Sequence, residues 1–87
     1  MKSKNPAWVV KEAQPHEDYT ITLKFQDGST RLYDARPLLE LPIYEPLKNP
    51  GFFMLARVDC STVIWNDEID IAPEHLYEAG KIIHDGA

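Results

Sequence analysis

The chain has 87 residues, of which 44% are hydrophobic and 26% charged, so its composition is that of one small globular domain and not of a disordered segment. No apolar run approaches the roughly 18 residues of a membrane span, and the first residues, MKSKNPAW, contain no apolar segment of the kind found in signal peptides. The net charge of −5 comes from residues 49–87, which hold seven acidic and two basic side chains, and this balance disfavours binding to nucleic acid.

The first two predicted elements are strands. The run from Trp8 to Ala13 is a short strand candidate, and the segment PHED forms the turn after it. In the run from Tyr19 to Phe25, apolar and polar residues alternate with a period of two, which is typical of a strand with one buried face.

The next segment predicts a β-hairpin. Asp27 and Gly28 suit the two central positions of a type I′ turn, in which both residues have positive φ. A two-residue loop of this type pairs Leu23 with Leu32 and places Leu32 on the core face.

Short helices are predicted after the hairpin. Asp34 is a suitable N-cap, and Pro37 is tolerated in a first helical turn. This helix, with the sequence RPLLEL, ends at Pro42, and a second helical turn is predicted within IYEPLK. The sequence NPG at 49–51 then interrupts the chain.

Three further strand-like runs follow, at 52–59, 62–65 and 69–71. Asn66 and Asp67 tolerate the left-handed region of backbone conformation, so a tight turn is predicted between the last two runs. Pro73 suits the first position of a helix and Gly80 its end, which predicts a helix of about two turns.

This order of elements predicts an α+β domain, with an antiparallel sheet of about five or six short strands and short helices packed on one face. The whole chain, 1–87, is expected to form a single domain. Its core is expected to span about residues 7–79, with 1–6 and 81–87 as flexible or docking ends. A soluble, cytoplasmic protein is the expectation.

The segment 63–80 is rich in carboxylates and is the first candidate site. No register of it supplies the oxygen ligands of a calcium loop, and His75 lacks the partner that a zinc motif requires. Turn chemistry and the favourable position of negative charge at a helix start account for most of these residues. The remaining hypothesis is an acidic, partner-binding face formed by Asp67, Glu68, Glu74 and Glu78.

No motif for catalysis is found. His16, His75 and His84 are far apart in the sequence, and neither a nucleophile elbow nor a glycine-rich phosphate loop is present. The single cysteine, Cys60, excludes an internal disulfide and a CxxC motif, and it is expected to be an ordinary turn residue. We therefore predict no catalytic residue, no metal ligand and no cofactor. Trp65 and Tyr77 are expected to be core residues that pack together under the last helix.

The patterns FQDGSTRLYD and VIWNDEIDIAPEHLY resemble those of a family of small bacterial and phage proteins, the domain of unknown function 2442 (DUF2442), over about residues 7–79. The matching positions are Phe25, Asp27, Gly28, Asp34, Trp65, Asp70, Pro73, Leu76 and Tyr77. One departure is Glu68, where the family often has glycine. The resemblance implies a small α+β domain and no established activity. Some relatives are encoded beside a second small protein, in an arrangement like that of toxin and antitoxin.

The leading functional hypothesis is a non-enzymatic protein-interaction module. It would be the acidic partner of a basic protein encoded by a neighbouring gene, with no direct binding to nucleic acid or membrane. The alternative is a small-ligand-binding or regulatory domain, whose pocket lies between sheet and helices with Tyr44, Arg36 or Arg57 at its rim. A homodimer formed through an open sheet edge, aided by Ile82 and Ile83, is a further option.

Overall fold

The computed structural model describes residues 8–59, 61–66 and 69–84. Its elements in chain order are β1 (Val10–Pro15), β2 (Thr20–Phe25), β3 (Thr30–Asp34), the 3₁₀ helices η1 (Arg36–Glu40) and η2 (Pro42–Lys48), α1 (Pro50–Phe53), β4 (Arg57–Asp59), β5 (Thr62–Asn66), β6 (Ile69–Asp70), α2 (Pro73–Ala79) and β7 (Lys81–His84).

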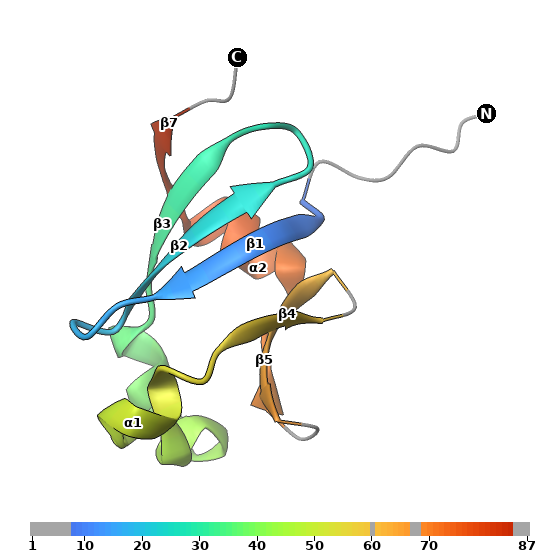
Figure 1. Cartoon of the computed structure of the whole chain (residues 1–87). Helices are drawn as coiled ribbons and strands as arrows, with labels where there is room; N and C mark the ends of the chain where they lie inside the picture. The colour runs from blue at the N-terminus through green and yellow to red at the C-terminus, as the bar shows by residue number, and fades with distance from the viewer. Residues whose placement is uncertain (1–7, 60, 67–68, 85–87) are drawn as a thin grey trace.

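The strands form two antiparallel sheets. The larger sheet has the order β1-β2-β3-β7, and the smaller has the order β4-β5-β6 (Figure 1). The α+β class predicted from the sequence is therefore confirmed. The expected single sheet of five or six strands is replaced, within the described residues, by two sheets with seven strands in total.

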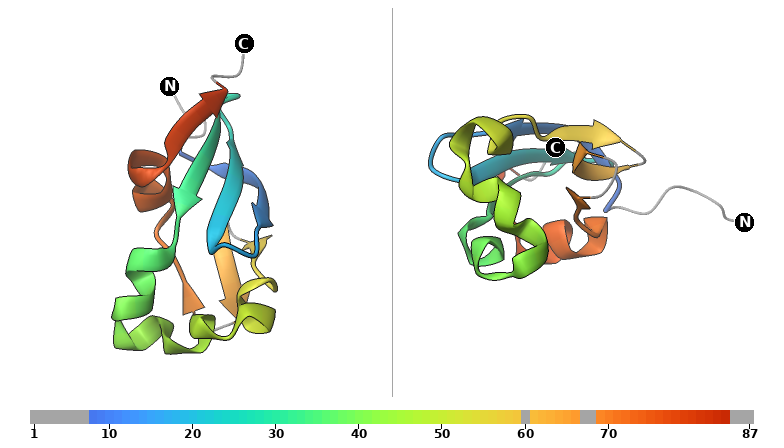
Figure 2. Two further views of the ribbon diagram at one scale, coloured as in Figure 1. Left: turned by 90° about the vertical axis from the view of Figure 1, so that its left-hand side faces the viewer. Right: turned by 90° about the horizontal axis from the view of Figure 1, so that it is seen from below.

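The helices do not share one face. Helix α2 lies against one face of the four-stranded sheet, whereas η1, η2 and α1 gather at one end of the molecule, beyond the end of β3 (Figures 1 and 2). The smaller sheet adjoins β1, where the backbone N–H of Val10 donates to the carbonyl oxygen of Ser61 at 3.1 Å. One hydrophobic core unites these parts. Its buried members are Val10, Ile21, Leu23, Phe25, Tyr33, Ala35, Leu38, Leu47, Phe53, Ala56, Val63, Trp65, Ile69, Ile71 and Leu76.

The β2–β3 hairpin is present, but its loop differs from the prediction. Phe25 N–H donates to the Ser29 carbonyl at 3.0 Å and Gly28 N–H donates to the Phe25 carbonyl at 2.9 Å, so the loop contains the three residues 26–28. Gly28 has φ of 89°, and Asp27 is not among the residues with positive φ. The loop thus has one left-handed residue in place of the two required by a type I′ turn.

The longer loop shifts the strand register. Leu23 pairs with Arg31, and Leu32 pairs with Thr22. Since successive residues of a strand face opposite sides, this shift of one residue exchanges the two faces of β3. Tyr33 is buried in the core, and Leu32, which was predicted to face the core, is half-buried on the other side.

Two of the predicted strands have different boundaries. The first strand is Val10–Pro15, two residues later than predicted. The run 52–59 is not a single strand, because its first residues belong to α1 and only Arg57–Asp59 is extended. Asn49 caps α1 by accepting the Gly51 N–H at 2.9 Å, and Pro50 occupies the first helical position.

The short helical segments were predicted correctly, although the cap is displaced. The N-cap of η1 is Ala35, not Asp34. Asp34 Oδ1 instead accepts the Arg36 N–H at 3.0 Å, which forms a side-chain turn immediately before the helix. The second predicted helical turn corresponds to η2, which ends at Lys48.

The predicted helix after Pro73 is confirmed as α2, and Gly80 follows it as its C-cap. The chain then continues into β7, which pairs with β3 and was not predicted as a strand. The predicted tight turn near Asn66 and the prediction for Cys60 involve residues outside the described ranges. Of that turn, the described part shows the Ile69 N–H donating to Asn66 Oδ1 at 3.0 Å.

Candidate functional site

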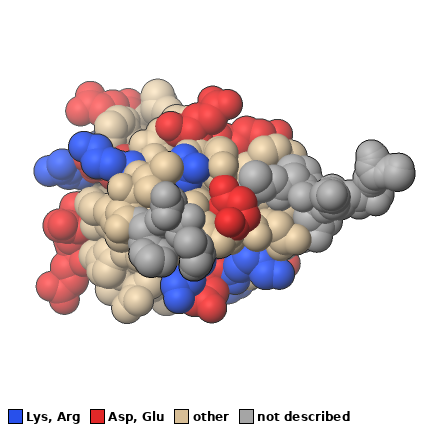
Figure 3. All heavy atoms as spheres, turned by 90° about the horizontal axis from the view of Figure 1, so that it is seen from above, with Lys and Arg blue, Asp and Glu red and all other residues tan. Residues whose placement is uncertain are grey.

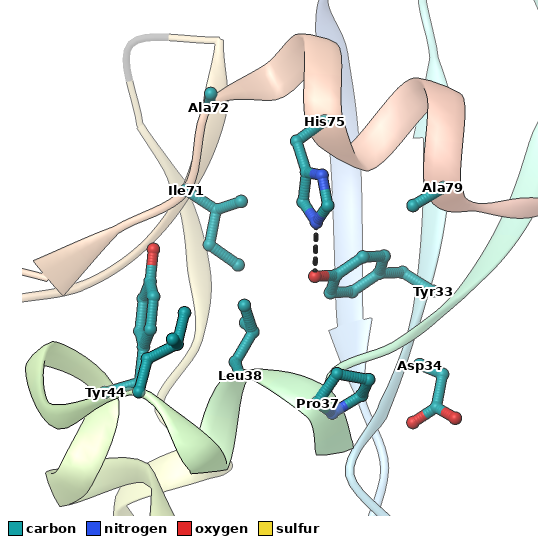
Figure 4. A pocket seen from close by; sticks show the side chains of 10 residues that line it. Tyr33, Asp34, Pro37, Leu38, Tyr44, Ile71, Ala72, His75 and Ala79 are labelled. Carbon is teal, nitrogen blue, oxygen red and sulfur yellow. Dashed lines mark hydrogen bonds between the residues drawn. The ribbon is translucent and has the colours of Figure 1, made fainter.

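A groove of about 490 Å³ lies between α2, the end of β3 and the two 3₁₀ helices (Figure 4). Its walls are mostly apolar. They consist of Tyr33, Asp34, Pro37, Leu38, Leu41, Tyr44, Ile71, Ala72, His75 and Ala79.

Helix α2 supplies one wall through three side chains at helical spacing. Ala72, His75 and Ala79 occupy positions i, i+3 and i+7, so they fall on one face of the helix. Leu76 is fully buried and belongs to the core, so α2 contacts the core with one face and the groove with the next. Pro73 in the first turn starts the helix, with Ala72 as its N-cap.

The opposite wall comes from a proline-rich segment. Pro37 is the second residue of η1, Pro42 is the first residue of η2, and Pro46 lies inside η2. Proline removes a backbone donor, which favours short 3₁₀ turns over a continuous α-helix at this point. The result holds Leu38 in the core and leaves Leu41 48% exposed at the margin of the groove.

Two tyrosines, Tyr33 and Tyr44, are among the residues that line the groove. The Tyr33 hydroxyl lies 2.9 Å from His75 Nε2, with the two rings edge-to-face (Figure 4). The Tyr44 hydroxyl donates to the Asp70 carbonyl at 2.8 Å. Burial raises the pKa of Tyr33 to about 12, and burial also raises the pKa of Tyr44. Both phenols therefore stay protonated at neutral pH and act as neutral hydrogen-bonding groups.

Of the acidic side chains at or beside the groove, Asp34 forms an ion pair, whereas none is found within the described part of the chain for Glu74 or Glu78. Asp34 accepts two hydrogen bonds from the Arg36 guanidinium, at 2.9 and 2.8 Å, and this interaction lowers the pKa of Asp34. Glu74 and Glu78 are exposed on α2. Among the described residues, ion pairs join Lys24 to Glu12, Arg36 to Asp34 and Lys48 to Glu45, and none involves Glu74 or Glu78.

The residues proposed from the sequence are only partly brought together. Glu74 and Glu78 share one face of α2 next to the groove, whereas Asp67 and Glu68 lie outside the described residues. Tyr44, which was predicted at the rim of a pocket, lines this groove. Arg36 is beside it through Asp34, and Arg57 is in β4.

Several groove residues were not anticipated. They are Leu38, Leu41, Ile71, Ala72 and Ala79. Small and aliphatic residues of this kind occur in any core, so no local signal in the sequence marks them as members of a site.

A second place, where the hairpin meets α2, brings together three of the positions that carry the family resemblance, Phe25, Asp27 and Tyr77. The Tyr77 hydroxyl donates to Asp27 Oδ2 at 2.6 Å, and the Tyr77 ring packs edge-to-face on Phe25 with centroids 5.0 Å apart. The Asp27 carboxylate also accepts the Ser29 N–H at 2.8 Å. The Tyr77 hydrogen bond, followed by the bonds from Ser29, lowers the pKa of Asp27.

Arg31 completes this contact. Its guanidinium lies 3.7 Å from the centroid of the Tyr77 ring and donates to the Tyr77 carbonyl at 2.7 Å. A cation at the carboxyl end of a helix is favourable because the last carbonyls have no partner within the helix. We call Asp27, Arg31 and Tyr77 the hairpin–helix contact. Trp65 lies elsewhere in the core, stacked near Phe53, so its ring and that of Tyr77 have different partners.

On the face seen from above, acidic and basic side chains are interspersed (Figure 3). No group of three or more His, Cys, Asp or Glu side chains in the described part of the chain is placed to hold a metal ion. Among the helices that the described residues form, none is long and apolar enough to cross a membrane.

A family model described as "Protein of unknown function (DUF2442)" matches residues 10–81, which is most of the chain. Searches of curated proteins and of solved structures found no match.

Proposed function

The chain belongs to the DUF2442 family, whose description assigns no activity, and we propose from its groove and its charges that it is a non-enzymatic interaction module for a basic partner protein. The observation that carries the proposal is the apolar groove beside α2.

The groove and its margin expose apolar surface. Leu41, which lines the groove, is 48% exposed, and Ile43, two residues further along the chain, is 62% exposed. Met54, Leu55, Ile82 and Ile83 are also exposed. Contiguous exposed apolar surface rimmed by polar residues is a common mark of a protein-interaction site. A partner segment with apolar side chains would bury this surface and gain free energy from the hydrophobic effect.

The charges favour a basic partner. No lysine or arginine occurs between Cys60 and Gly80, and Glu74 and Glu78 lie exposed on the helix that forms one wall of the groove. Oppositely charged groups at the rim of an interface mainly accelerate association and select the partner. A basic protein from a neighbouring gene, in a two-gene module of the toxin–antitoxin kind, has the required chemistry.

The test is to co-express the chain with the product of each adjacent gene and to measure the affinity of any purified complex by calorimetry. We expect a complex whose affinity falls with salt and falls by about tenfold in the double variant Glu74→Lys, Glu78→Lys, because rim charges contribute modestly. Glu17→Lys, at an exposed turn on another part of the surface, is the matched control. No complex with either neighbour, or equal loss with the control, would contradict the proposal.

A second candidate function is binding of a small apolar ligand. The groove volume of about 490 Å³ lies within the range of about 300–1,000 Å³ typical of ligand pockets, and the Tyr33–His75 pair provides a polar contact inside it. A ligand of this class raises the melting temperature by mass action. A fragment screen by thermal shift in which Leu41→Asp abolishes the stabilisation would favour this candidate over the protein partner.

A further inference from the structure

We infer that the element of the partner that occupies the groove is an amphipathic α-helix with apolar anchors and flanking basic residues, an inference that rests on the proposed function. Three observations carry it: the paired backbone N–H groups of the helical turns in the groove walls, the size of the groove, and the position of the acidic side chains.

The first observation concerns backbone hydrogen bonds. Much of the wall comes from helical turns whose backbone N–H groups are already paired, for example Tyr44 N–H to the Leu41 carbonyl at 3.0 Å and Leu76 N–H to the Ala72 carbonyl at 3.3 Å. Ile71 N–H is also used, by the Val63 carbonyl at 3.2 Å. An extended segment laid over these turns would find few backbone groups to pair with, and each of its own N–H or C=O groups shielded from water without a partner would cost free energy. A helix satisfies its backbone internally and presents only side chains.

The second observation is the size of the groove. A cavity of about 150 Å³ is left when one large aliphatic side chain is removed from a core, so about 490 Å³ accommodates about three such side chains. In a helix, anchors at i, i+3 or i+4, and i+7 span about 10 Å. The groove face of α2 extends over the same seven-residue interval, from Ala72 to Ala79. The small side chains at its two ends leave room for another helix to approach.

The third observation is the position of the charges. Successive residues of an α-helix are separated by about 100°, so Glu74 and Glu78 occupy the face of α2 that borders the His75 side of the groove. A helix lying in the groove would carry its basic residues at the border of its apolar face, within reach of these carboxylates. Lysine and arginine suit this position because their aliphatic stems cover apolar surface while their charged ends remain in water.

The first experiment uses the complex obtained with a neighbouring protein. Ala79→Leu places a larger side chain into the groove at an exposed helical position and preserves helix propensity, so the variant is expected to fold and to bind the partner about tenfold more weakly. Lys11→Leu, an equally apolar replacement on the exposed side of β1, should bind normally. If the Ala79→Leu variant binds the partner normally, the inference that a partner helix occupies the groove is wrong. The proposed interaction function would not be contradicted by that result.

The second experiment needs no natural partner. Three 16-residue peptides of one composition, each with one proline, are titrated into the isotopically labelled chain. The first is amphipathic, with leucines at i, i+4 and i+7 bordered by lysines and its proline away from the centre, and the second is a scrambled version of it. The third keeps the residue order of the first, except that its proline is moved to the centre. We expect only the first to shift the amide resonances of Leu38, Leu41, His75 and Ala79, because central proline breaks a helix. Equal shifts with the third peptide, shifts confined to another surface, or no shift at millimolar amphipathic peptide would each overturn the inference.

Discussion

At the scale of single residues, Gly80 is a position where a side chain would clash with its neighbours, although the backbone conformation does not require glycine. Its φ of −70° and ψ of 140° are accessible to any residue. A Cβ at this position, however, would lie 2.7 Å from the Leu76 carbonyl oxygen and 3.1 Å from Arg31 Cβ. The passage from α2 into β7 therefore depends on the close approach of the chain to β3.

We predict that Gly80→Ala destabilises the protein by about 1–3 kcal/mol, since the new methyl group meets a backbone atom that cannot move without disturbing α2. Chemical denaturation is the measurement. Gly51→Ala is the matched control, because a Cβ there meets only Asn49 Oδ1, at 3.4 Å, and its effect should be close to zero. Equal stability of the two variants would contradict the steric explanation.

Single positions also show where sequence reasoning fails. The dipeptide Asp27-Gly28 is compatible with a two-residue loop and with a three-residue loop, because both place glycine in the left-handed region. The three-residue loop shifts the register of β3 by one residue, and as a result Tyr33, not Leu32, faces the core. The choice depends on what the second strand packs against, which the local sequence does not contain.

At the scale of elements, the hairpin–helix contact joins segments that are about fifty residues apart in the chain. The carboxylate of Asp27 stabilises its own loop through Ser29 and also accepts the hydroxyl of Tyr77. Arg31 binds the carboxyl end of α2 from the same side. These contacts hold the loop of the hairpin and the carboxyl end of α2 together.

We predict that Tyr77→Phe lowers the free energy of unfolding slightly at neutral pH, because it removes the hydrogen bond to Asp27, for which water competes at this exposed position. The lowered pKa of Asp27 means that its contribution is present above the ordinary carboxyl pKa of 3.8 and is lost as the pH falls through the lower value in the folded state. The difference in stability between wild type and variant should therefore shrink below about pH 4.

Urea denaturation across this pH range measures the difference. Tyr19→Phe is the control, since the Tyr19 hydroxyl donates to the Lys48 carbonyl at 2.6 Å, an acceptor that does not titrate. The stability difference for Tyr19→Phe should stay constant as the pH falls. A Tyr77→Phe difference that is equally constant would show that Asp27 is not its partner in solution.

The elements differ in how well the sequence predicted them. The alternation in β2 and the Pro73…Gly80 frame of α2 are local patterns, and both were confirmed. Helix α1 has the local signal Asn49-Pro50, a cap followed by a proline at the first helical position, which was interpreted only as a break. Strand β7 is four residues long, and its residues Lys81, Ile82 and Ile83 are all exposed, so no alternation of buried and exposed positions marked it.

At the scale of the whole molecule, the two sheets share one core. Val63 and Trp65 of the smaller sheet belong to the same buried cluster as Ile21 and Leu23 of the larger. The Trp65 indole N–H also donates to the Phe53 carbonyl at 2.9 Å, which ties β5 to the helical end of the molecule. A shared core of this kind favours unfolding as one unit.

We predict that the smaller sheet does not melt separately. In a Trp8→Phe variant, the fluorescence of Trp65 reports on the smaller sheet, and far-ultraviolet circular dichroism reports on the whole backbone. The two denaturation curves should coincide. A fluorescence transition at lower denaturant would show that β4–β6 unfolds independently.

The groove itself is a property of the whole molecule, which limits its prediction from sequence. Its walls combine the end of β3, the two 3₁₀ helices, Ile71 and α2. Of the three predicted rim residues, Tyr44, Arg36 and Arg57, only Tyr44 lines the groove. The aliphatic members have no chemistry of their own, and only the assembled fold brings them together.

The pairing of β7 with β3 has a consequence for synthesis on the ribosome. Residues 30–32 of β3 leave the exit tunnel roughly fifty residues before their partners in Lys81–His84. During that interval the nascent chain has β1, β2 and β3 available but one side of β3 lacks a neighbour, and an unpaired strand edge is a template for association between chains. When β7 is synthesised, it pairs with this edge of β3. We therefore expect that neighbouring nascent chains on a polysome can pair through this edge only until β7 has emerged.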